Sequence, residues 1–297
     1  MSATQTFPHA NAEPGILADL LDLTKARLNL LVLITTFVGY WMAAQGTMDW
    51  LRLLQTMLGT ALCAASAAAF NQLWEVRVDA LMPRTASRPI VAGRMTGGAA
   101  FWIALALGVA GTAWLAFSAN LLSAALAAST IIIYVLLYTP MKRRTAWCTL
   151  VGAVSGALPP VVGWTAASQH LALGAWILFG VLFAWQMPHF LAIAWMYREQ
   201  YRGAGLVMLK RDDETGVPTA VTAFLFTLLL TAITMIPFDA GFTGSLYLGG
   251  ALLINSFFFL AALNFVADRS RPVARRLFFA SIIYLPLILG LMVFTKQ

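Results

Sequence analysis

The stretch NQLWEVRVD places an amide and two carboxylates four residues apart at the end of an apolar run. In an α-helix, Asn71, Glu75 and Asp79 would share one stripe, because residues at i, i+4 and i+8 drift by only about 40° per step. Oxygen ligands on one stripe suit Mg²⁺, which favours one or two carboxylates together with substrate phosphates. The same spacing also fits acids that simply pair with Arg77 and neighbouring cations at a membrane boundary. Spacing alone leaves both interpretations open.

Basic residues close behind this stripe favour a diphosphate site. Arg84 and Arg88 follow in LMPRTASRPIVAG, a segment interrupted by two prolines. Arg side chains fork phosphate oxygens, while Mg²⁺ bridges the same group to carboxylates. Charge bias at a membrane surface would explain roughly half of the basic residues near the apolar runs without any ligand. The further candidates for binding the substrate are Lys25, Tyr138, Lys142 and Arg143.

A second polar stretch, WQMPHFLAIAWMYREQY, ends another apolar run. His189 lies inside that run, and a histidine there is more often a hydrogen-bonded packing residue than a ligand. Glu199 is a candidate second carboxylate, facing the first stripe across the bundle, and so a candidate catalytic residue and metal ligand. The three acids at 212–214 are expected to be solvated loop charges.

The composition indicates a membrane protein. The chain has 297 residues, of which 60% are hydrophobic and only 10% charged, whereas ordinary soluble domains are about a quarter charged. Residues 1–15 show no features of a removable signal peptide and are expected to be flexible. Residues 16–29 fit an amphipathic helix in the headgroup layer or, equally, a solvated extension of the first span. Cys63 and Cys148 match no metal-binding spacing.

Nine apolar runs are long enough to cross a bilayer core, which requires about 20 residues per helix. The predicted fold class is all-α, a polytopic membrane bundle of nine transmembrane helices forming a single domain over residues 16–297. The expected spans lie near 28–45, 52–74, 99–117, 121–139, 146–167, 172–196, 218–237, 244–266 and 276–294.

The positions of the basic residues alternate as nine spans require. Of the 19 Lys and Arg residues, all but Arg52 and Lys296 fall in the amino-terminal segment or in the loops after spans 2, 4, 6 and 8. This bias orients the amino terminus and those loops toward the cytoplasm, in a multi-pass protein of the cell inner membrane. The net charge of +7 is therefore mostly topology; the expected partner is the lipid bilayer, and nucleic-acid binding is not needed to explain it.

Four separated motifs together resemble the protohaem IX farnesyltransferases, a branch of the UbiA-type intramembrane prenyltransferases. The motifs are NQLWEVRVDALMPRTASRPIVAG, YTPMKRRT, SGALPPVVGW and WQMPHFLAIAWMYREQYRGAGLVML, and the resemblance runs from LTKARLNLLVLITTFVGY to the ninth span. It implies that the stripe at 71–79 forms the first Mg²⁺-diphosphate motif, with Glu75 in place of the more usual Asp. Ala26 departs from the family's Pro. Gln200 stands where an acid commonly precedes Tyr201, which puts the role of Glu199 in doubt.

The resemblance implies transfer of a farnesyl group from farnesyl diphosphate to a vinyl group of haem b, giving haem O. Mg²⁺ would be the cofactor and haem b a substrate, with His189 contacting its iron or propionates. Diphosphate would leave with the help of Mg²⁺ and basic side chains, the vinyl group would attack the allylic cation, and water would capture the product cation. Haem A synthase or terminal-oxidase assembly are the implied protein partners.

Two alternatives to this function remain. The same fold could act on a quinone or chlorophyll precursor. A polytopic transporter is a different class, and it would place its acids near the bilayer midplane rather than at one face.

Overall fold

Nine long helices dominate the computed structural model, which describes residues 15–297. Residues 1–14, nearly all of the segment expected to be flexible, lie outside the described part. Within that part no strand forms, apart from an isolated bridge between Thr243 and Lys296, and the all-α prediction is confirmed. The helices long and apolar enough to span a membrane are α2 (Ala26–Ala43), α3 (Trp50–Asp79), α4 (Gly97–Ser118), the composite span Leu121–Met141, α7 (Cys148–Ser168), α8 (Leu173–Met196), α10 (Val217–Asp239), α11 (Ser245–Ala267) and α12 (Arg271–Phe294).

The composite fourth span contains a wide turn near its end. It consists of α5 (Leu121–Ile132), the π-helical turn η1 (Ile133–Tyr138) and α6 (Thr139–Met141). Pro140 has no N–H to continue the regular ladder, and the Thr139 hydroxyl donates to the carbonyl of Tyr134 at 2.8 Å. Wide turns of this kind often occur at functional sites, and this one directly precedes two residues of the site described below.

The amino-terminal amphipathic segment forms a helix separate from the first span. Helix α1 (Ile16–Leu23) ends before Lys25, whose φ of 49° breaks the path into α2. Ile16 and Leu17 are 80% and 70% exposed, whereas Asp19 is buried and pairs with Arg94 at 2.8 Å. A separate helix with an exposed apolar side fits the headgroup-layer interpretation better than a continuous extension of the span.

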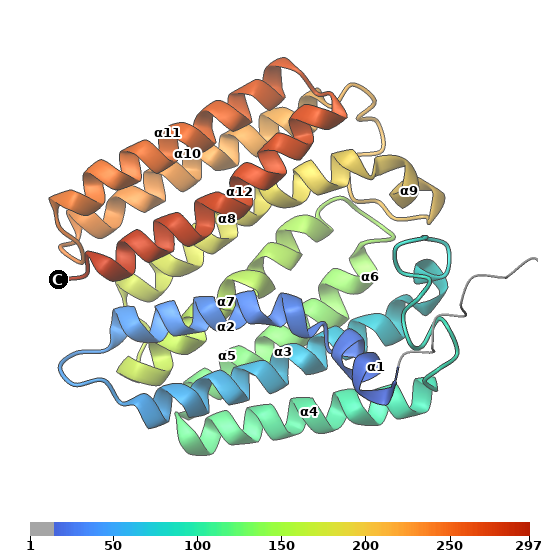
Figure 1. Ribbon diagram of the computed structural model, residues 1–297, viewed down its shortest axis with the longest axis horizontal. Coiled ribbons are helices and arrows are strands. Elements are labelled where there is room, and N and C mark those ends of the chain that lie inside the picture. The colour runs from blue at the N-terminus through green and yellow to red at the C-terminus, as the bar shows by residue number, and fades with distance from the viewer. Residues whose placement is uncertain (1–14) are drawn as a thin grey trace, which may run out of the picture.

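The spans form two groups that meet along α7 and α8 (Figure 1). One group contains α2, α3, α4, α5 and α7, and the other contains α8, α10, α11 and α12. Helices α2 and α7 approach closely through glycines: a Cβ at Gly163 would lie 2.0 Å from the Thr36 carbonyl oxygen, and one at Gly39 would lie 1.9 Å from the Pro160 oxygen. Small residues at crossings are typical of membrane helices, because they let backbones touch. The prediction of a single domain stays a prediction.

A buried polar network joins the last three helices. The Tyr284 hydroxyl of α12 donates to Asn255 Oδ1 of α11 at 2.8 Å, and Asn255 Nδ2 donates to Thr234 Oγ1 of α10 at 3.0 Å. Tyr247 donates to the Thr234 carbonyl at 2.9 Å. These groups are almost fully buried. Lipid tails cannot hydrogen-bond to polar groups, so each of these groups needs a partner within the protein.

Two helix boundaries differ from the prediction in a way that affects the site. Helix α3 was expected to end near residue 74 but continues to Asp79. Helix α12 was expected from residue 276 but begins at Arg271. In both cases the helix extends beyond the apolar run because polar residues at a membrane helix end can remain helical in the interfacial layer. The extension of α3 places the whole acid stripe on one rigid element.

Candidate functional site

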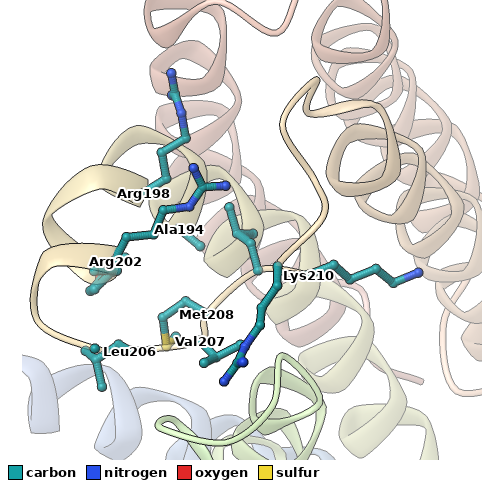
Figure 2. Close-up of a pocket in the computed structure, with 11 residues that line it drawn as sticks. Ala194, Arg198, Arg202, Leu206, Val207, Met208 and Lys210 are labelled. Carbon is teal, nitrogen blue, oxygen red and sulfur yellow. The ribbon is translucent and has the colours of Figure 1, made fainter.

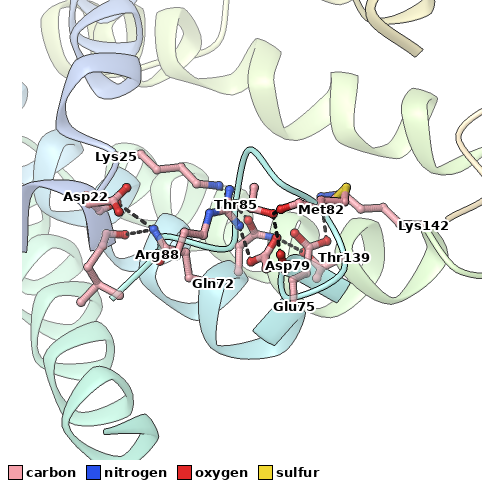
Figure 3. Close-up of polar contacts among 12 residues, drawn as sticks. Asp22, Lys25, Gln72, Glu75, Asp79, Met82, Thr85, Arg88, Thr139 and Lys142 are labelled. Atoms are coloured by element: carbon pink, nitrogen blue, oxygen red, sulfur yellow. Dashed lines mark hydrogen bonds and ion pairs between the residues drawn. The ribbon is translucent and has the colours of Figure 1, made fainter. Parts of the chain in front are cut away.

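The acid stripe lies at one end of α3 and is buried. Asn71, Glu75 and Asp79 are 1%, 8% and 1% exposed. Buried carboxylates are costly unless each has a partner. The structure supplies a separate basic side chain for each of the three residues, from three different parts of the chain (Figure 3).

The partner of Asn71 is Lys25, from the break between α1 and α2. Its ammonium donates to Asn71 Oδ1 at 2.8 Å, and Asn71 Nδ2 donates to Thr139 Oγ1 at 3.2 Å. The left-handed backbone at Lys25 turns the chain at this point. Burial lowers the pKa of the Lys25 ammonium, and the positive charges of Arg88 and Lys142 act in the same direction. The site therefore holds Lys25 at an electrostatic cost that a bound anion would relieve.

The partner of Glu75 is Lys142, which follows α6. The Lys142 ammonium donates to Glu75 Oε1 at 2.8 Å and lies 4.5 Å from the centre of the Tyr138 ring. Burial disfavours the charge on Lys142, but Tyr138 and Glu75 outweigh it and hold its pKa above the ordinary range. Lys142 is consequently charged when it faces the stripe.

The partner of Asp79 is Arg88, in the loop between α3 and α4. Arg88 Nη1 forms an ion pair with Asp79 Oδ2, and the Thr85 hydroxyl donates to the Asp79 carbonyl oxygen at 2.9 Å. These contacts fold the loop back over the end of α3 (Figure 3). The interpretation that the acids pair with nearby cations is confirmed, but the partners are Arg88 and Lys142 rather than Arg77.

The assembled cluster has the composition of a site for a metal-bound diphosphate. Two carboxylates and an amide oxygen are hard ligands of the kind that Mg²⁺ prefers. Among the described residues, no three His, Cys, Asp or Glu side chains gather into a metal-binding group, so substrate oxygens and water would have to complete a coordination shell. Three basic side chains that already point at the ligands could contact those substrate oxygens.

Arg84 lies in the same loop as Arg88, but within the described residues it contacts two tyrosines rather than the acid stripe. Its guanidinium donates to the Tyr201 hydroxyl at 2.8 Å and lies over the rings of Tyr197 and Tyr201. It thereby ties the loop after α3 to α9 (Arg198–Gly203). Its predicted role in binding the substrate stays a prediction.

Two predicted residues, Glu199 and Arg143, do not contact the cluster. The Glu199 side chain is 87% exposed, and its ion pair within residues 15–297 is with Arg198 at 4.0 Å. Arg143 is exposed, as is Gln200, the residue after Glu199. Glu199 leads away from the stripe because the turn between α8 and α9 directs this face of α9 outward, so its assignment as a metal ligand is not supported by its position.

Asp213 was expected to be a solvated loop charge, and that expectation is wrong. It is 2% exposed, and its carboxylate accepts from the backbone N–H of Gly216 at 2.7 Å and of Thr219 at 3.0 Å, as well as from the Thr219 hydroxyl. These bonds satisfy the free donors at the start of α10. The signal in the sequence was an acid shortly before a proline in the first helical turn, a pattern typical of a helix start.

His189 lies on α8 against α12. Its Nδ1 is 2.7 Å from Ser281 Oγ, and its ring stacks on Trp185 with centroids 4.9 Å apart. The Ser281 hydroxyl donates its proton to the Phe278 carbonyl at 2.6 Å, so Ser281 Oγ must accept from Nδ1–H. This arrangement leaves the lone pair on Nε2, which is the arrangement of a histidine prepared to bind a metal.

Sequence reasoning missed two supporting residues. Thr139 links Asn71 to the π turn, and it lies in a motif whose role was assigned only to its tyrosine and basic residues. Gln72 donates to the Asp22 carbonyl at 2.7 Å and so ties α1 to α3. A polar residue facing the core next to the acid stripe was the available signal for Gln72.

Comparisons with known proteins place most of the chain in one family. The model of the UbiA prenyltransferase family matches residues 32–283. The protoheme IX farnesyltransferase of Solibacter usitatus is 42% identical over 287 residues, which cover 94% of this chain and 98% of that protein. The mitochondrial protoheme IX farnesyltransferase of Homo sapiens is 39% identical over 286 residues, covering 96% of this chain and 63% of that protein.

A solved structure adds support for the fold alone. A UbiA homolog from Archaeoglobus fulgidus bound to GPP and Mg²⁺ matches with a TM-score of 0.64 at 13% identity, covering 92% of this chain and 99% of that one. At this identity the likeness shows a shared arrangement of helices.

Proposed function

The chain belongs to the UbiA prenyltransferase family, and we propose that it transfers a farnesyl group from farnesyl diphosphate to a vinyl group of protohaem IX, giving haem O. The observation that carries the proposal is the cluster at the end of α3, where Asn71, Glu75 and Asp79 each have their own basic partner. The names of curated relatives supply the acceptor and the chain length of the donor.

The side chains present fit a Mg²⁺-diphosphate unit. Asn71, Glu75 and Asp79 would hold the ion, which when bound supplies positive charge to the departing diphosphate. Lys25, Arg88 and Lys142 would donate to the diphosphate oxygens, since all three already reach the stripe. Tyr138, Arg84 and Arg143 complete the proposed substrate site. The Tyr138 ring lies against Lys142, Arg84 contacts Tyr201, and Arg143 is exposed.

These residues would favour cleavage of the allylic C–O bond. The bonding electron pair leaves with the diphosphate oxygen, where preorganised cations stabilise the developing charge. The vinyl group of the acceptor then donates its π electrons to the farnesyl cation, forming the new C–C bond. Water adds to the resulting cation and loses a proton, which leaves the hydroxyl group. Buried walls around the stripe would limit earlier capture of the farnesyl cation by water.

His189 is the proposed contact to the acceptor's iron. The bond from Nδ1–H to Ser281 fixes the ring and leaves Nε2 free to coordinate. Replacing Ser281 with Ala should weaken haem binding less than replacing His189 with Ala, because the ring loses only its orientation. Unchanged haem affinity in the His189→Ala variant, measured by absorbance titration, contradicts this role.

The basic end of the bundle is proposed to face the cytoplasm from the inner membrane. The candidate site lies at this end, together with all the Lys and Arg residues except Arg52 and Lys296. Single-cysteine accessibility at an exposed loop position such as Arg143 tests the orientation. The proposal includes haem A synthase or the assembly of a terminal oxidase as the step that uses haem O.

The function is tested by incubating purified protein with haem b, farnesyl diphosphate and Mg²⁺, and identifying the pigment by mass spectrometry. Haem O is expected with the wild-type protein, and neither with Asp79→Asn nor without metal. If pyrophosphate were released while haem b stayed unchanged, the family assignment would stand, but the acceptor would be a different molecule, for instance a quinone precursor. If the folded protein turned over neither substrate, the proposed prenyltransferase activity would be contradicted.

A transporter is disfavoured because the acids lie in the last turns of α3, rather than near the bilayer midplane.

A further inference from the structure

A groove of about 540 Å³ opens between α7 and α10, over α8, at the same end of the bundle as the candidate site. Its floor is apolar, with Leu150 from α7, Met187 and Leu191 from α8, and Phe226 from α10. The segment 207–211, called the strap here, forms one wall. None of the residues of the acid stripe or their basic partners lines this groove.

The mouth of the groove carries unneutralised positive charge. Arg144, Lys210 and Arg211 line it and are exposed, and none of them forms an ion pair within residues 15–297. Asp212 is the exposed acid among the lining residues. The other acid, Asp213, is buried and already engaged at the start of α10. Basic charge therefore lies directly above an apolar trough.

The start of α7 borders the groove but offers it no free hydrogen-bond donors. Thr149, in the first turn of α7, lines the groove and is buried. The backbone N–H groups of Cys148, Thr149 and Leu150 donate to carbonyls of the turn that precedes the helix, at 3.2, 3.3 and 3.0 Å. Attraction of an anion to the mouth therefore depends on the exposed cations.

We propose that this groove binds an anionic phospholipid of the surrounding bilayer. Basic pockets between membrane helices at the cytoplasmic side recognise anionic headgroups, and the apolar floor would hold an acyl chain. Trp147, 66% exposed at the groove's edge, is of the type that anchors at the membrane interface. The haem acceptor is not the proposed occupant, because none of the acid stripe or its basic partners lines this groove.

A second hollow lies on the far side of the strap, and its lining is less suited to a lipid than that of the groove. This hollow of about 340 Å³ lies between α9 and the strap and adds Arg198 and Arg202 (Figure 2). Both are engaged, since Arg202 donates to the Asp213 carbonyl at 3.4 Å and Arg198 lies 4.4 Å from the Trp195 ring centre. Its lining comes from α9, the strap and the end of α8, so it offers no trough along the spans for an acyl chain.

The strap connects the groove to the candidate site. The Val207 N–H donates to the Lys142 carbonyl at 2.6 Å, and Val207 O accepts from the Cys148 thiol at 3.8 Å. A lipid that fills the groove would hold the strap, and through it Lys142, in the position that faces Glu75. This consequence rests on the proposed function, whereas lipid binding itself does not.

Binding is tested on the full chain in detergent with photoactivatable phosphatidylglycerol, followed by peptide mapping and native mass spectrometry. Label is expected in peptides containing 144–150 and 207–211. The variant Lys210→Gln/Arg211→Gln should retain roughly thirtyfold less phosphatidylglycerol, at about fivefold per cation. The matched control Arg271→Gln/Arg275→Gln removes the same charge from exposed residues of α12 and should label as the wild type does.

Three results would overturn the site. These are equal retention in the strap variant and the α12 control, equal labelling by phosphatidylcholine, and displacement of phosphatidylglycerol by equimolar protohaem IX, which would make the groove an acceptor site. The coupling is tested separately in nanodiscs. Stimulation of turnover by phosphatidylglycerol should disappear in the strap variant, and stimulation that persists there would refute the link through Val207. Because the binding assay contains neither farnesyl diphosphate nor Mg²⁺, no prenyl transfer occurs in it, and its outcome is independent of whether haem O is the product.

Discussion

The ion pair between Lys142 and Glu75 makes a sharp test of the candidate site, because the same two residues should contribute to stability and to turnover. The Lys142→Met substitution keeps much of the side-chain length and removes the charge. It leaves the Glu75 carboxylate buried without its 2.8 Å partner. We expect it to lower both stability and activity, for different physical reasons.

The size of the stability effect follows from the burial of the pair. The two side chains are 12% and 10% exposed. At an effective dielectric constant of about 20, charges this close attract by roughly 6 kcal/mol before desolvation is subtracted. Breaking a buried pair by removing one partner typically costs about 3–5 kcal/mol, because the remaining charge is uncompensated. Lys142→Met should therefore lower the free energy of unfolding by about 3 kcal/mol.

A double-mutant cycle separates the two roles. Glu75→Gln combined with Lys142→Met removes both charges, so most of the lost stability should return, with a coupling energy of about 2 kcal/mol or more. Activity should not return, since a metal ligand and a cation for the leaving group are both gone. Loss of one preorganised stabilising group costs about 10²–10³ in kcat. Stability would be measured by unfolding in mixed micelles, and activity by haem O formation.

Two results would refute this reasoning. Additive stability effects in the cycle would show that the pair is not energetically coupled. A double variant with activity near that of the wild type would show that neither residue serves the diphosphate. Lys142→Arg is the control for charge, and it should keep more stability than Lys142→Met.

Three further predictions test other parts of the structure. The lowered pKa of Lys25 means that it loses its proton at a lower pH than a free lysine would. Affinity for farnesyl diphosphate should therefore fall as pH rises through that pKa. In the Lys25→Arg variant the KM should depend less on pH, because Arg stays charged. Gly163→Ala should cost about 1–3 kcal/mol of stability by forcing α2 and α7 apart, while Gly290→Ala, where a Cβ meets no atom within 4 Å, should cost far less. Tyr284→Phe should cost about 1 kcal/mol, by stranding Asn255 Oδ1 among α10, α11 and α12, and thermal unfolding in detergent would measure it.

The spans could be predicted from the sequence because hydropathy and the distribution of basic residues are both local signals. A bilayer core fixes the helix length, and alternating loops fix the count. The ends were harder, since α3 continues past its apolar run to Asp79. Hydropathy falls at Glu75, yet the helix persists because its polar stripe finds partners from other elements.

Spacing could predict that Asn71, Glu75 and Asp79 share one stripe of a helix, but it could not predict their partners. Lys142 lies 67 residues from Glu75 in the sequence, and no local rule selects it over Arg143, its neighbour. The two acids Glu199 and Asp213 show the same limit. The sequence favoured Glu199 as the functional acid and Asp213 as the solvated one, whereas the structure exposes Glu199 and buries Asp213 at a helix start. Burial depends on how the loop after α8 folds, which composition does not encode.

The ion pairs of the cluster and the proposed metal site, which the sequence left as competing interpretations, are compatible. Lys25, Arg88 and Lys142 face two carboxylates, so the cluster carries one net positive charge. A diphosphate monoester carries about three negative charges, so its arrival alone would leave about two uncompensated among buried groups, while drawing the cations off the acids. A divalent ion on the vacated carboxylates restores balance. Diphosphate and metal should therefore bind cooperatively, and calorimetry should find farnesyl diphosphate binding weak without Mg²⁺ in the wild type but less dependent on the metal in Glu75→Gln.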